Sequence, residues 1–209
     1  TVIFGPKLSF AVIAKEELND LQEVKKLARR VTVDASVFDQ AGCASPHNIY
    51  IEKGGAVSPE EFCNLLAEIF PKTEIQIPKP TVSMEQVSAI HSARGVYDFK
   101  GKVWGSETMS WTVLYSEDDD LSKPVYSRVL MVHAVDDMNE AIDNITDYIQ
   151  TIGIAAPEDR AKEFALKATA KGVARLPQIG RMLNFEMPWD GIFLIDRLVK
   201  WNTLFGPLR

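Results

Sequence analysis

The loop at 38–48 contains the residue type best suited to covalent chemistry. It places Cys43 beside Gly42, between a predicted helix and a predicted strand. Glycine lets a ligand or another backbone approach closely, and a polar loop can stay open to a substrate. A thiolate that attacks a carbonyl or thioester carbon needs that exposure, together with amide donors that stabilise the oxyanion. Free cysteine is nevertheless among the most buried residue types, so the spacing alone favours a small packed side chain over a nucleophile.

His47 follows Cys43 by four residues, which suggests a thiolate-imidazolium pair. That spacing brings two side chains together only on a helix, and Pro46 disfavours the helical region for Ser45. The residues therefore favour a histidine at the surface or at the start of a strand, and the pair stays an alternative.

Other residues of nucleophilic or metal-ligating type favour structural roles. Cys63 falls inside a predicted helix and is expected to be a packed thiol. His91 and His133 fall on an apparent helix and strand, and no pair of the three histidines has the spacing of a zinc site. The acidic run at 117–120 lacks the alternating ligands and the glycine of a calcium loop, so it is expected to be a solvated turn. No metal is predicted.

The composition excludes several classes of protein. Among 209 residues, 23 are Lys or Arg and 29 are Asp or Glu, which gives a net charge of −6 and no basic stripe for a nucleic acid partner. A hydrophobic share of 46% and a charged share of 25% are typical of a folded globular protein. No apolar run approaches the ~20 residues that a membrane helix needs. Two cysteines cannot form a disulfide framework, and with no export signal we expect a cytoplasmic protein.

Strands that alternate with helices must position this loop. Apolar runs and turn residues predict strands at 8–13, 48–52, 104–115, 125–132, 151–156 and 173–176. Amphipathic spacing predicts helices at 16–30, at 59–70 with Pro71 as the stop, and at 84–93, 136–149 and 157–171, with a further amphipathic stretch at 189–205. The alternation predicts an α/β fold with a mostly parallel sheet flanked by helices. In such folds, sites usually lie at the carboxyl ends of the strands.

Phe38-Asp39-Gln40, together with Cys43 and Ser45-Pro46, resembles the nucleophile segment of the LuxC family. These long-chain fatty acyl-CoA reductases of bacterial light-emitting (bioluminescence) operons belong to the aldehyde dehydrogenase superfamily. Four further segments, at 4–9, 111–114, 150–154 and 188–191, also resemble the family, and all five segments occur in the expected order. Each piece is weak alone, but the five in order are fairly specific, and the resemblance spans 4–201.

The resemblance implies an aldehyde-dehydrogenase-like catalytic domain and a definite reaction. The cysteine attacks a long-chain fatty acyl-CoA, coenzyme A leaves, and hydride from NADPH reduces the enzyme thioester to a fatty aldehyde. Cys43 would be the nucleophile, and its own amide would form half of the oxyanion site within the loop of Gln40, Gly42, Cys43 and Ala44. His47 is a possible base on its spacing alone, not through the resemblance. The family also implies an acyl-protein synthetase and an acyltransferase as partners, and a homo-oligomer that pairs through edge strands.

Residues 1–209 resemble only the catalytic domain with a C-terminal tail. In the superfamily, the second oxyanion group is an asparagine upstream of Thr1, and the nucleotide-binding domain also lies mostly upstream. The sequence has no glycine-rich dinucleotide fingerprint. We therefore expect a fragment in which NADPH is bound mainly by a missing domain, and which is inactive when isolated.

Two departures from the superfamily pattern bear on the chemistry. Ile3 and Phe4 stand where hydrolytic aldehyde dehydrogenases carry a glutamate base ahead of Gly5-Pro6-Lys7. Without that base water is poorly activated, which favours reduction or acyl transfer over acid formation. Lys123-Pro124-Val125-Tyr126 lacks the glutamate that holds the nicotinamide ribose, so cofactor positioning must differ.

Two alternatives to the reductase stay open. A nicotinamide-independent cysteine acyltransferase or thioesterase would use Cys43 with His47 as its base. A non-catalytic assembly domain would retain the pairing surface and carry an inert, slowly alkylated Cys43.

Overall fold

The computed structural model describes residues 5–118, 120–200 and 202–203. Several sequence predictions fall partly outside these ranges. Ile3 and Phe4 precede them, Asp119 lies in the gap of the acidic run, and Trp201 and the end of the stretch at 189–205 also lie outside the described residues.

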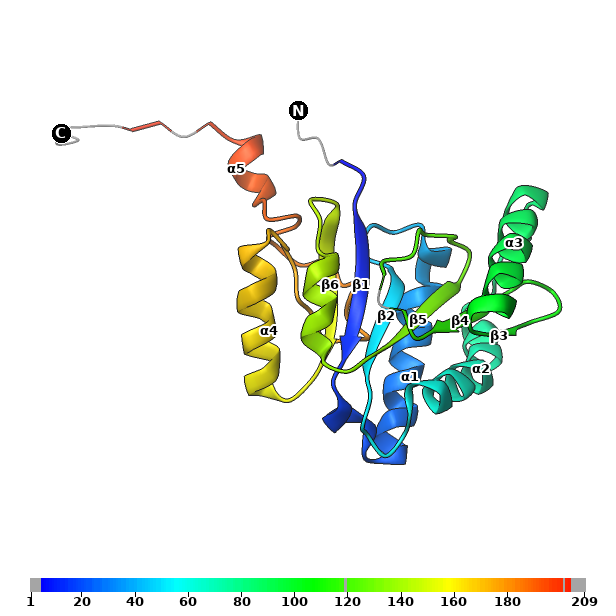
Figure 1. Cartoon of the computed structure of the whole chain (residues 1–209). Coiled ribbons are helices and arrows are strands. Elements are labelled where there is room, and N and C mark those ends of the chain that lie inside the picture. Colours follow the sequence, from blue (N-terminus) through cyan, green and yellow to red (C-terminus); the bar gives the residue numbers. More distant parts are fainter. Residues whose placement is uncertain (1–4, 119, 201, 204–209) are drawn as a thin grey trace.

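A six-stranded sheet forms the centre of the molecule (Figure 1). Its strands are β1 (Leu8–Ile13), β2 (Pro46–Glu52), β3 (Lys102–Gly105), β4 (Thr112–Ser116), β5 (Val129–Val135) and β6 (Ile149–Ala155). They lie in the order β3-β4-β5-β2-β1-β6, and every neighbouring pair is parallel except β3 and β4. The predicted α/β class and mostly parallel sheet are confirmed.

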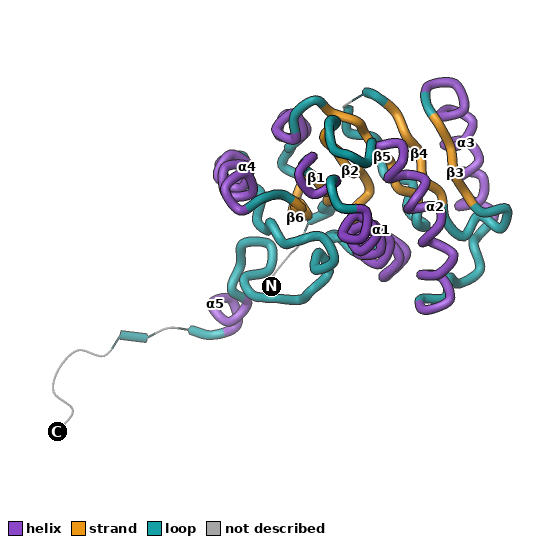
Figure 2. Tube along the Cα trace, turned by 90° about the horizontal axis from the view of Figure 1, so that it is seen from below, coloured by secondary structure: helices purple, strands orange, loops and turns teal. Residues whose placement is uncertain are grey.

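Helices cover both faces of the sheet (Figure 2). The α-helices are α1 (Leu21–Ser36), α2 (Pro59–Gln76), α3 (Met84–Lys100), α4 (Glu158–Ala170) and the short α5 (Leu194–Leu198). The described chain also contains the 3-10 helices η1 (Lys15–Leu18), η2 (Val37–Gln40) and η3 (Met138–Asn144). Helices α1 and α2 pack on one face, and α3, η3 and α4 on the other.

The sequence of β1 is a continuous apolar run rather than an alternating one because both faces of the strand are covered. Ala11 and Ile13 pack toward α1, while Phe10 and Val12 pack toward α4. A strand that is covered on both faces buries every side chain, so its pattern carries no period of two. This is why β1 has the bounds that its sequence predicts, whereas the strand expected at 125–132 is β5, at Val129–Val135.

Helix α2 contradicts the predicted stop at Pro71. The helix runs through Pro71 to Gln76, because the turn that follows still has a buried face. Thr73 is buried there and its hydroxyl lies 2.8 Å from that of Thr32 on α1. Proline removes one backbone donor, but the packing of this face outweighs that loss.

Other boundaries differ from the prediction for local reasons. The helix expected at 84–93 continues to Lys100 because Tyr97 packs on the same face as Ile90. The strand expected at 104–115 is a hairpin, β3 and β4, whose turn is held by the Ser106 hydroxyl accepting from the Ser110 N–H. The helix expected at 136–149 is only the 3-10 helix η3, and the chain then enters β6.

The C-terminal part also differs. The strand expected at 173–176 makes only isolated bridges to β6, at Arg175 and Gln178, because Pro177 between them has no N–H to donate to a ladder. Within the described part of 189–205, the only helix is α5. Asp190 and Gly191 adopt positive φ angles of 51° and 70°, which end regular structure ahead of it.

The Cys43 loop lies at the opposite edge of the sheet from the one where sites in such folds usually lie. The loop with Cys43 leads into β2, so it lies at the amino ends of the parallel strands, at the top of Figure 1. A connection from a helix to a strand always arrives at the amino ends of the parallel strands. The general rule for the position of sites concerns loops that lead from a strand to a helix, at the carboxyl ends.

Candidate active site

Cys43 is partly exposed and lines an open cleft of about 510 Å³ at the amino edge of the sheet. Four segments supply its walls, namely the chain before β1, the loop before β2, the chain before β5 and the chain before β6. Its lining residues are Gly5, Pro6, Lys7, Leu8, Ala41, Gly42, Cys43, His47, Pro124, Tyr126 and Tyr148. The thiol is therefore not the small packed side chain that spacing alone favoured.

The backbone of Cys43 is fixed while its side chain reaches the cleft. The hydroxyl of Ser9, at the start of β1, donates to the Cys43 carbonyl at 2.7 Å. The Ser45 N–H donates to the Gly42 carbonyl at 3.0 Å and closes a tight turn. Among the described residues, none accepts a hydrogen bond from the Cys43 N–H. That amide is therefore available as a donor for an anion that forms next to the sulfur.

Gln40 supports the loop from the inside. Its side-chain amide donates to the Pro46 and Val129 carbonyls at 2.8 and 2.9 Å, and its oxygen accepts from the Val129 N–H at 2.8 Å. Gln40 thus links the amino ends of β2 and β5 through its side chain, much as backbone hydrogen bonds link two neighbouring strands. It is fully buried and does not line the cleft, and Ala44 is likewise buried. Of the predicted oxyanion-loop residues, the structure brings only Gly42 and Cys43 to the cleft.

Two left-handed segments brace each other beside the cysteine. Phe38, Asp39 and Gln40 have positive φ angles, and so do the three residues at 126–128. The Ser127 N–H donates to the Asp39 carbonyl at 3.0 Å. Conformations of this kind persist only where surrounding contacts determine them.

The ion pair between Arg128 and Asp39 is the strongest of these contacts. Arg128 Nε lies 2.6 Å from Asp39 Oδ1, the arginine is almost fully buried, and its Nη1 donates to the Ile77 carbonyl. Lys79 donates from the other side to the Ser127 hydroxyl at 2.6 Å. Burial lowers the pKa of Lys79 to about 8, although the charge of Asp39 opposes that shift. Sequence reasoning missed this support because its partners lie far apart along the chain.

His47 lies at the start of β2, which is one of the two positions that the sequence predicts for it. It is buried and therefore not a surface histidine. Its ring meets that of Tyr126 edge to face, with 5.0 Å between centroids. Burial lowers the pKa of the imidazole to about 4, so the ring is neutral at neutral pH. The described residues show no hydrogen bond between His47 and Cys43, so no preformed pair exists.

Buried polar atoms without partners gather at this edge of the sheet. Within the described chain they include Ser45 Oγ, His47 Nδ1, Gln150 Oε1 and Thr151 Oγ1. Thr151 lies in register with Ser9, the residue that holds the Cys43 carbonyl. Leaving a buried polar group unpaired costs free energy, so each such group in a folded protein calls for an explanation. Several of them lie beside the Cys43 loop.

The remaining candidates of the sequence analysis have structural surroundings. Cys63 is fully buried, which raises the pKa of its thiol, and it is the packed thiol that we expected. His133 lies on β5 with its ring nitrogens 2.8 Å from the Asp118 carbonyl and from Asn48 Oδ1. The described residues contain no group of three or more His, Cys, Asp or Glu that could hold a metal ion. In the same ranges, no helix is long and apolar enough to cross a membrane.

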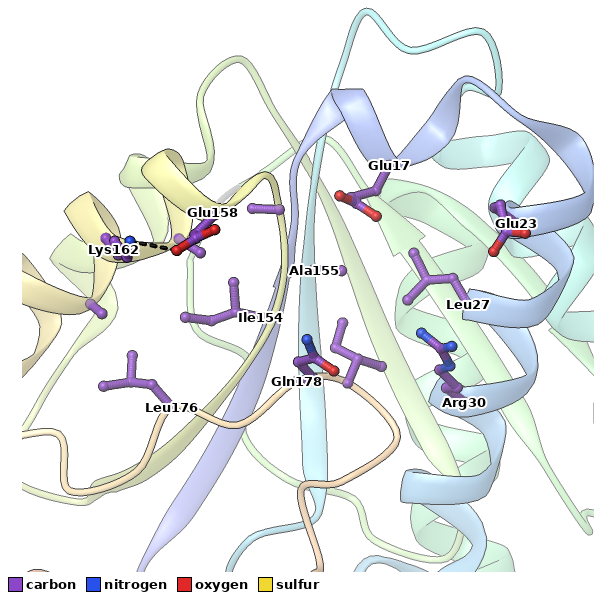
Figure 3. A pocket seen from close by; sticks show the side chains of 14 residues that line it. Glu17, Glu23, Leu27, Arg30, Ile154, Ala155, Glu158, Lys162, Leu176 and Gln178 are labelled. Carbon is purple, nitrogen blue, oxygen red and sulfur yellow. Dashed lines mark hydrogen bonds and ion pairs between the residues drawn. The ribbon is translucent and has the colours of Figure 1, made fainter.

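The opposite edge of the sheet carries a cavity of about 580 Å³, between α1, α4 and the end of β6 (Figure 3). Charged side chains surround it, among them Glu17, Arg30 and Lys162, and the last is paired with Glu158 at 2.5 Å. The described residues that line it include no cysteine, serine or histidine. Its lining lacks the thiol on which the sequence-based prediction rests, whereas the cleft at the amino edge contains Cys43.

Comparison with known proteins gives a consistent family. The sequence model of the family described as acyl-CoA reductase (LuxC) matches residues 1–201. The long-chain acyl-protein thioester reductase of Vibrio harveyi is 29% identical over 202 residues, which are 95% of this chain and 40% of that protein. Long-chain acyl-protein thioester reductase 2 of Photobacterium leiognathi is 27% identical over 202 residues, with the same coverage. The chain thus spans about 40% of the length of these relatives.

Solved structures agree on the fold. A point mutant of Thermus thermophilus 1-pyrroline-5-carboxylate dehydrogenase superposes with a TM-score of 0.58 at 17% identity, over 83% of this chain and 36% of that one. An NAD-dependent benzaldehyde dehydrogenase from Corynebacterium glutamicum gives 0.57 at 15% identity, over 82% and 39%. These likenesses show an aldehyde-dehydrogenase-like fold.

Proposed function

Because the chain belongs to the acyl-CoA reductase (LuxC) family, we propose that it is the catalytic part of an oxidoreductase that converts long-chain fatty acyl thioesters to fatty aldehydes through an acyl group on Cys43. The observation that carries the proposal is the position of this cysteine. Its side chain reaches an open cleft, its carbonyl is fixed by Ser9, and its amide donates to no other described residue, so it can meet an oxyanion.

In the acyl-transfer step, the thiolate of Cys43 attacks the thioester carbon and forms a new carbon-sulfur bond. The negative charge that develops on the carbonyl oxygen meets the Cys43 N–H. Collapse of the tetrahedral species breaks the old carbon-sulfur bond, and the departing thiolate takes a proton from solvent. The acyl group then remains on Cys43 as a thioester.

Reduction of the acyl group also needs a hydride donor. The sequence has no glycine-rich phosphate loop, so we assign nucleotide binding to a domain mostly upstream of Thr1, with residues 1–209 as the catalytic domain and tail. A reduced nicotinamide, which we propose to be NADPH, would supply a hydride for the acyl carbon, and Cys43 would then leave as the thiolate when the aldehyde is released. Such a protein would act in the cytoplasm.

The carrier of the acyl group is part of the proposal. The relatives are named for acyl-protein thioesters, whereas the family is described as acyl-CoA reductases. Both carriers present the same thioester carbon, and the cleft is open enough for a substrate to enter from solvent. An acyl-protein synthetase and an acyltransferase would be the partners in the first case.

A second candidate function rests on His47. Its neutral ring lines the cleft, and Nδ1 has no hydrogen-bond partner among the described residues, so it could accept a proton from Cys43 or from water. With that base, the chain would be a nicotinamide-independent acyltransferase or thioesterase.

Intact-protein mass spectrometry tests the acyl-transfer step. After incubation with a long-chain acyl-CoA, we expect the chain to gain one acyl group, the Cys63→Ala control to gain the same group, and Cys43→Ala to gain none. Acylation that persists in Cys43→Ala would overturn the proposal. Continuous thioester hydrolysis without nicotinamide, lost in His47→Ala, would favour the second function.

A further inference from the structure

The outer face of α1 is basic although the chain as a whole is acidic. Lys25, Lys26, Arg29 and Arg30 are all exposed on this helix, in a chain with a net charge of −6. We expected no basic stripe, and α1 corrects this over a short stretch, because the helix brings two separate pairs of cations onto one side. Like charges four residues apart destabilise a helix slightly, so the arrangement does not serve the helix itself.

Most cations on this surface have no carboxylate partner within the chain. Lys26 pairs with Glu23 at 2.7 Å. Among the described residues, no carboxylate forms an ion pair with Lys25, with Arg29 or with the neighbouring Lys72 of α2. Their charges are therefore available to an anionic group from outside.

A groove of about 330 Å³ lies between α1 and α2 at this basic face. Its floor is apolar and recessed, since Leu65 is buried and Ile69 half-buried. Its rim carries three exposed cations, Lys25 and Arg29 from α1 and Lys72 from α2, which we call the rim cations. An apolar floor with a basic rim calls for an occupant that is itself partly apolar and partly acidic.

The two walls of the groove are fixed relative to each other. Arg29 Nη2 donates to Gln76 Oε1 at 3.1 Å, so one rim cation links α1 to the end of α2. The hydroxyls of Thr32 and Thr73 lie 2.8 Å apart, and both residues are buried. The groove is therefore preformed, and a preformed site loses less conformational entropy when a partner binds.

Shape and charge together select the class of partner. A lipid surface needs protruding apolar side chains, but the apolar floor here is recessed. The net charge of −6 disfavours a nucleic acid. A groove between two helices suits an amphipathic helix, whose apolar stripe lies in the groove while its charged borders meet the rim. Because the rim is basic, those borders must be acidic.

We propose that the groove between α1 and α2 is a docking site for an acidic amphipathic helix of a partner protein. Leu65 and Ile69 receive its apolar stripe, and the rim cations pair with carboxylates on its two borders. Lys25 and Arg29 lie about 6 Å apart along α1, which matches acidic residues one turn apart on the partner helix. Docking at this surface goes beyond the acyl chemistry of Cys43 and does not depend on it.

Fluorescence anisotropy with a labelled synthetic peptide tests the docking site. The probe is a helical peptide with one stripe of leucines bordered on both sides by glutamates, and the control peptide has lysine in place of each glutamate. We expect the full chain to bind the acidic peptide saturably, to bind it more weakly as salt is added, and to bind the basic peptide hardly at all. Equal binding of the two peptides, or no binding of the acidic one, would overturn the proposal.

Variants at exposed positions locate the binding surface. Lys25→Gln together with Lys72→Gln should weaken binding of the acidic peptide by roughly 5- to 20-fold. Glu68→Gln removes the one carboxylate among the lining residues and should strengthen binding by about 2- to 5-fold. Lys162→Gln together with Lys167→Gln, on α4, removes the same charge elsewhere and should leave binding unchanged. Equal weakening in the two double variants would show unspecific attraction and contradict a docking site.

Two other occupants of the groove give different results. In the chain joined to the upstream domain that we propose, Lys25 and Lys72 should react with an acetylating reagent as readily as the exposed Lys162 does. Protection of both would show that the upstream domain fills the groove, which would overturn docking of a separate protein. Binding of anionic lipid vesicles that is lost in Lys25→Gln with Lys72→Gln, without binding of the acidic peptide, would assign the surface to a membrane and equally overturn the proposal.

Discussion

At the scale of single residues, Cys43 depends on neighbours that never face the cleft. Ser9 fixes its carbonyl, and Gln40 ties its loop to β5. The residue type and its motif make Cys43 the candidate nucleophile, which stays a prediction, and Cys63 was correctly assigned to the core. The role of Gln40 could not be predicted, because its partner Val129 is 89 positions away and only the sheet brings them together.

Replacing Gln40 tests that support. Gln40→Ala removes three hydrogen bonds in a buried place, so we expect the free energy of unfolding to fall by about 2–4 kcal/mol. Chemical denaturation measures the change. Gln22→Ala, on an exposed side chain of α1, is the matched control and should change it by less than about 0.5 kcal/mol. Equal effects of the two substitutions would contradict a supporting role.

His47 gives a prediction about how the stability of the fold depends on pH. Its pKa falls from 6.5 when unfolded to about 4 when folded, so the unfolded state takes up the proton first. The stability that neutral His47 contributes is therefore complete above about pH 6.5 and is lost as the pH falls toward 4, by about 3 kcal/mol in total. Burial raises the pKa of Asp34 to about 6, which acts in the opposite direction over part of this range.

The contribution of His47 must therefore be measured as a difference. The free energy of unfolding of the unmodified chain minus that of His47→Gln should decrease between pH 6.5 and 4, while Asp34 cancels in the subtraction. A difference that stays constant over this interval would show that His47 is not held neutral by burial.

At the scale of elements, strands were predicted better than helix ends. Strands β1 and β2 are covered on both faces, so their apolar runs can be recognised from the local sequence alone. The end of α2 depends instead on Thr73 meeting Thr32 of another helix. The edge of the sheet at which the Cys43 loop lies was also not evident from local pattern, since it depends on which kind of connection carries the cysteine.

Pro71 provides the test at this scale. Within α2 it leaves one carbonyl without its helical donor, so Pro71→Ala should raise the free energy of unfolding by about 1–2 kcal/mol after the entropy of the unfolded chain is deducted. Pro59→Ala, at the first position of the same helix, removes no helical hydrogen bond and should not stabilise the protein. Thermal denaturation compares the two, and destabilisation by Pro71→Ala would contradict this explanation of the helix.

At the scale of the whole molecule, the chain corresponds to about 40% of the length of its relatives, and its cleft lies at the same edge as Gly5, where the described chain begins. Under the proposed function, acyl transfer and aldehyde formation are separate abilities of this chain. The chain should accept an acyl group from a long-chain acyl thioester, but it should form no aldehyde when NADPH is added. Gas chromatography measures the aldehyde, and robust formation by residues 1–209 would contradict the assignment of nucleotide binding to an upstream domain.

The most direct test of the central claim follows one acyl group through the chain joined to the upstream domain that we propose for nucleotide binding. The protein is loaded with a labelled long-chain acyl thioester, freed of excess substrate, and then given NADPH. We predict that the label is first found on the peptide containing Cys43 and is then released as fatty aldehyde in a single turnover. Label that stays on Cys43 after NADPH is added, or aldehyde that forms in Cys43→Ala, would contradict the account.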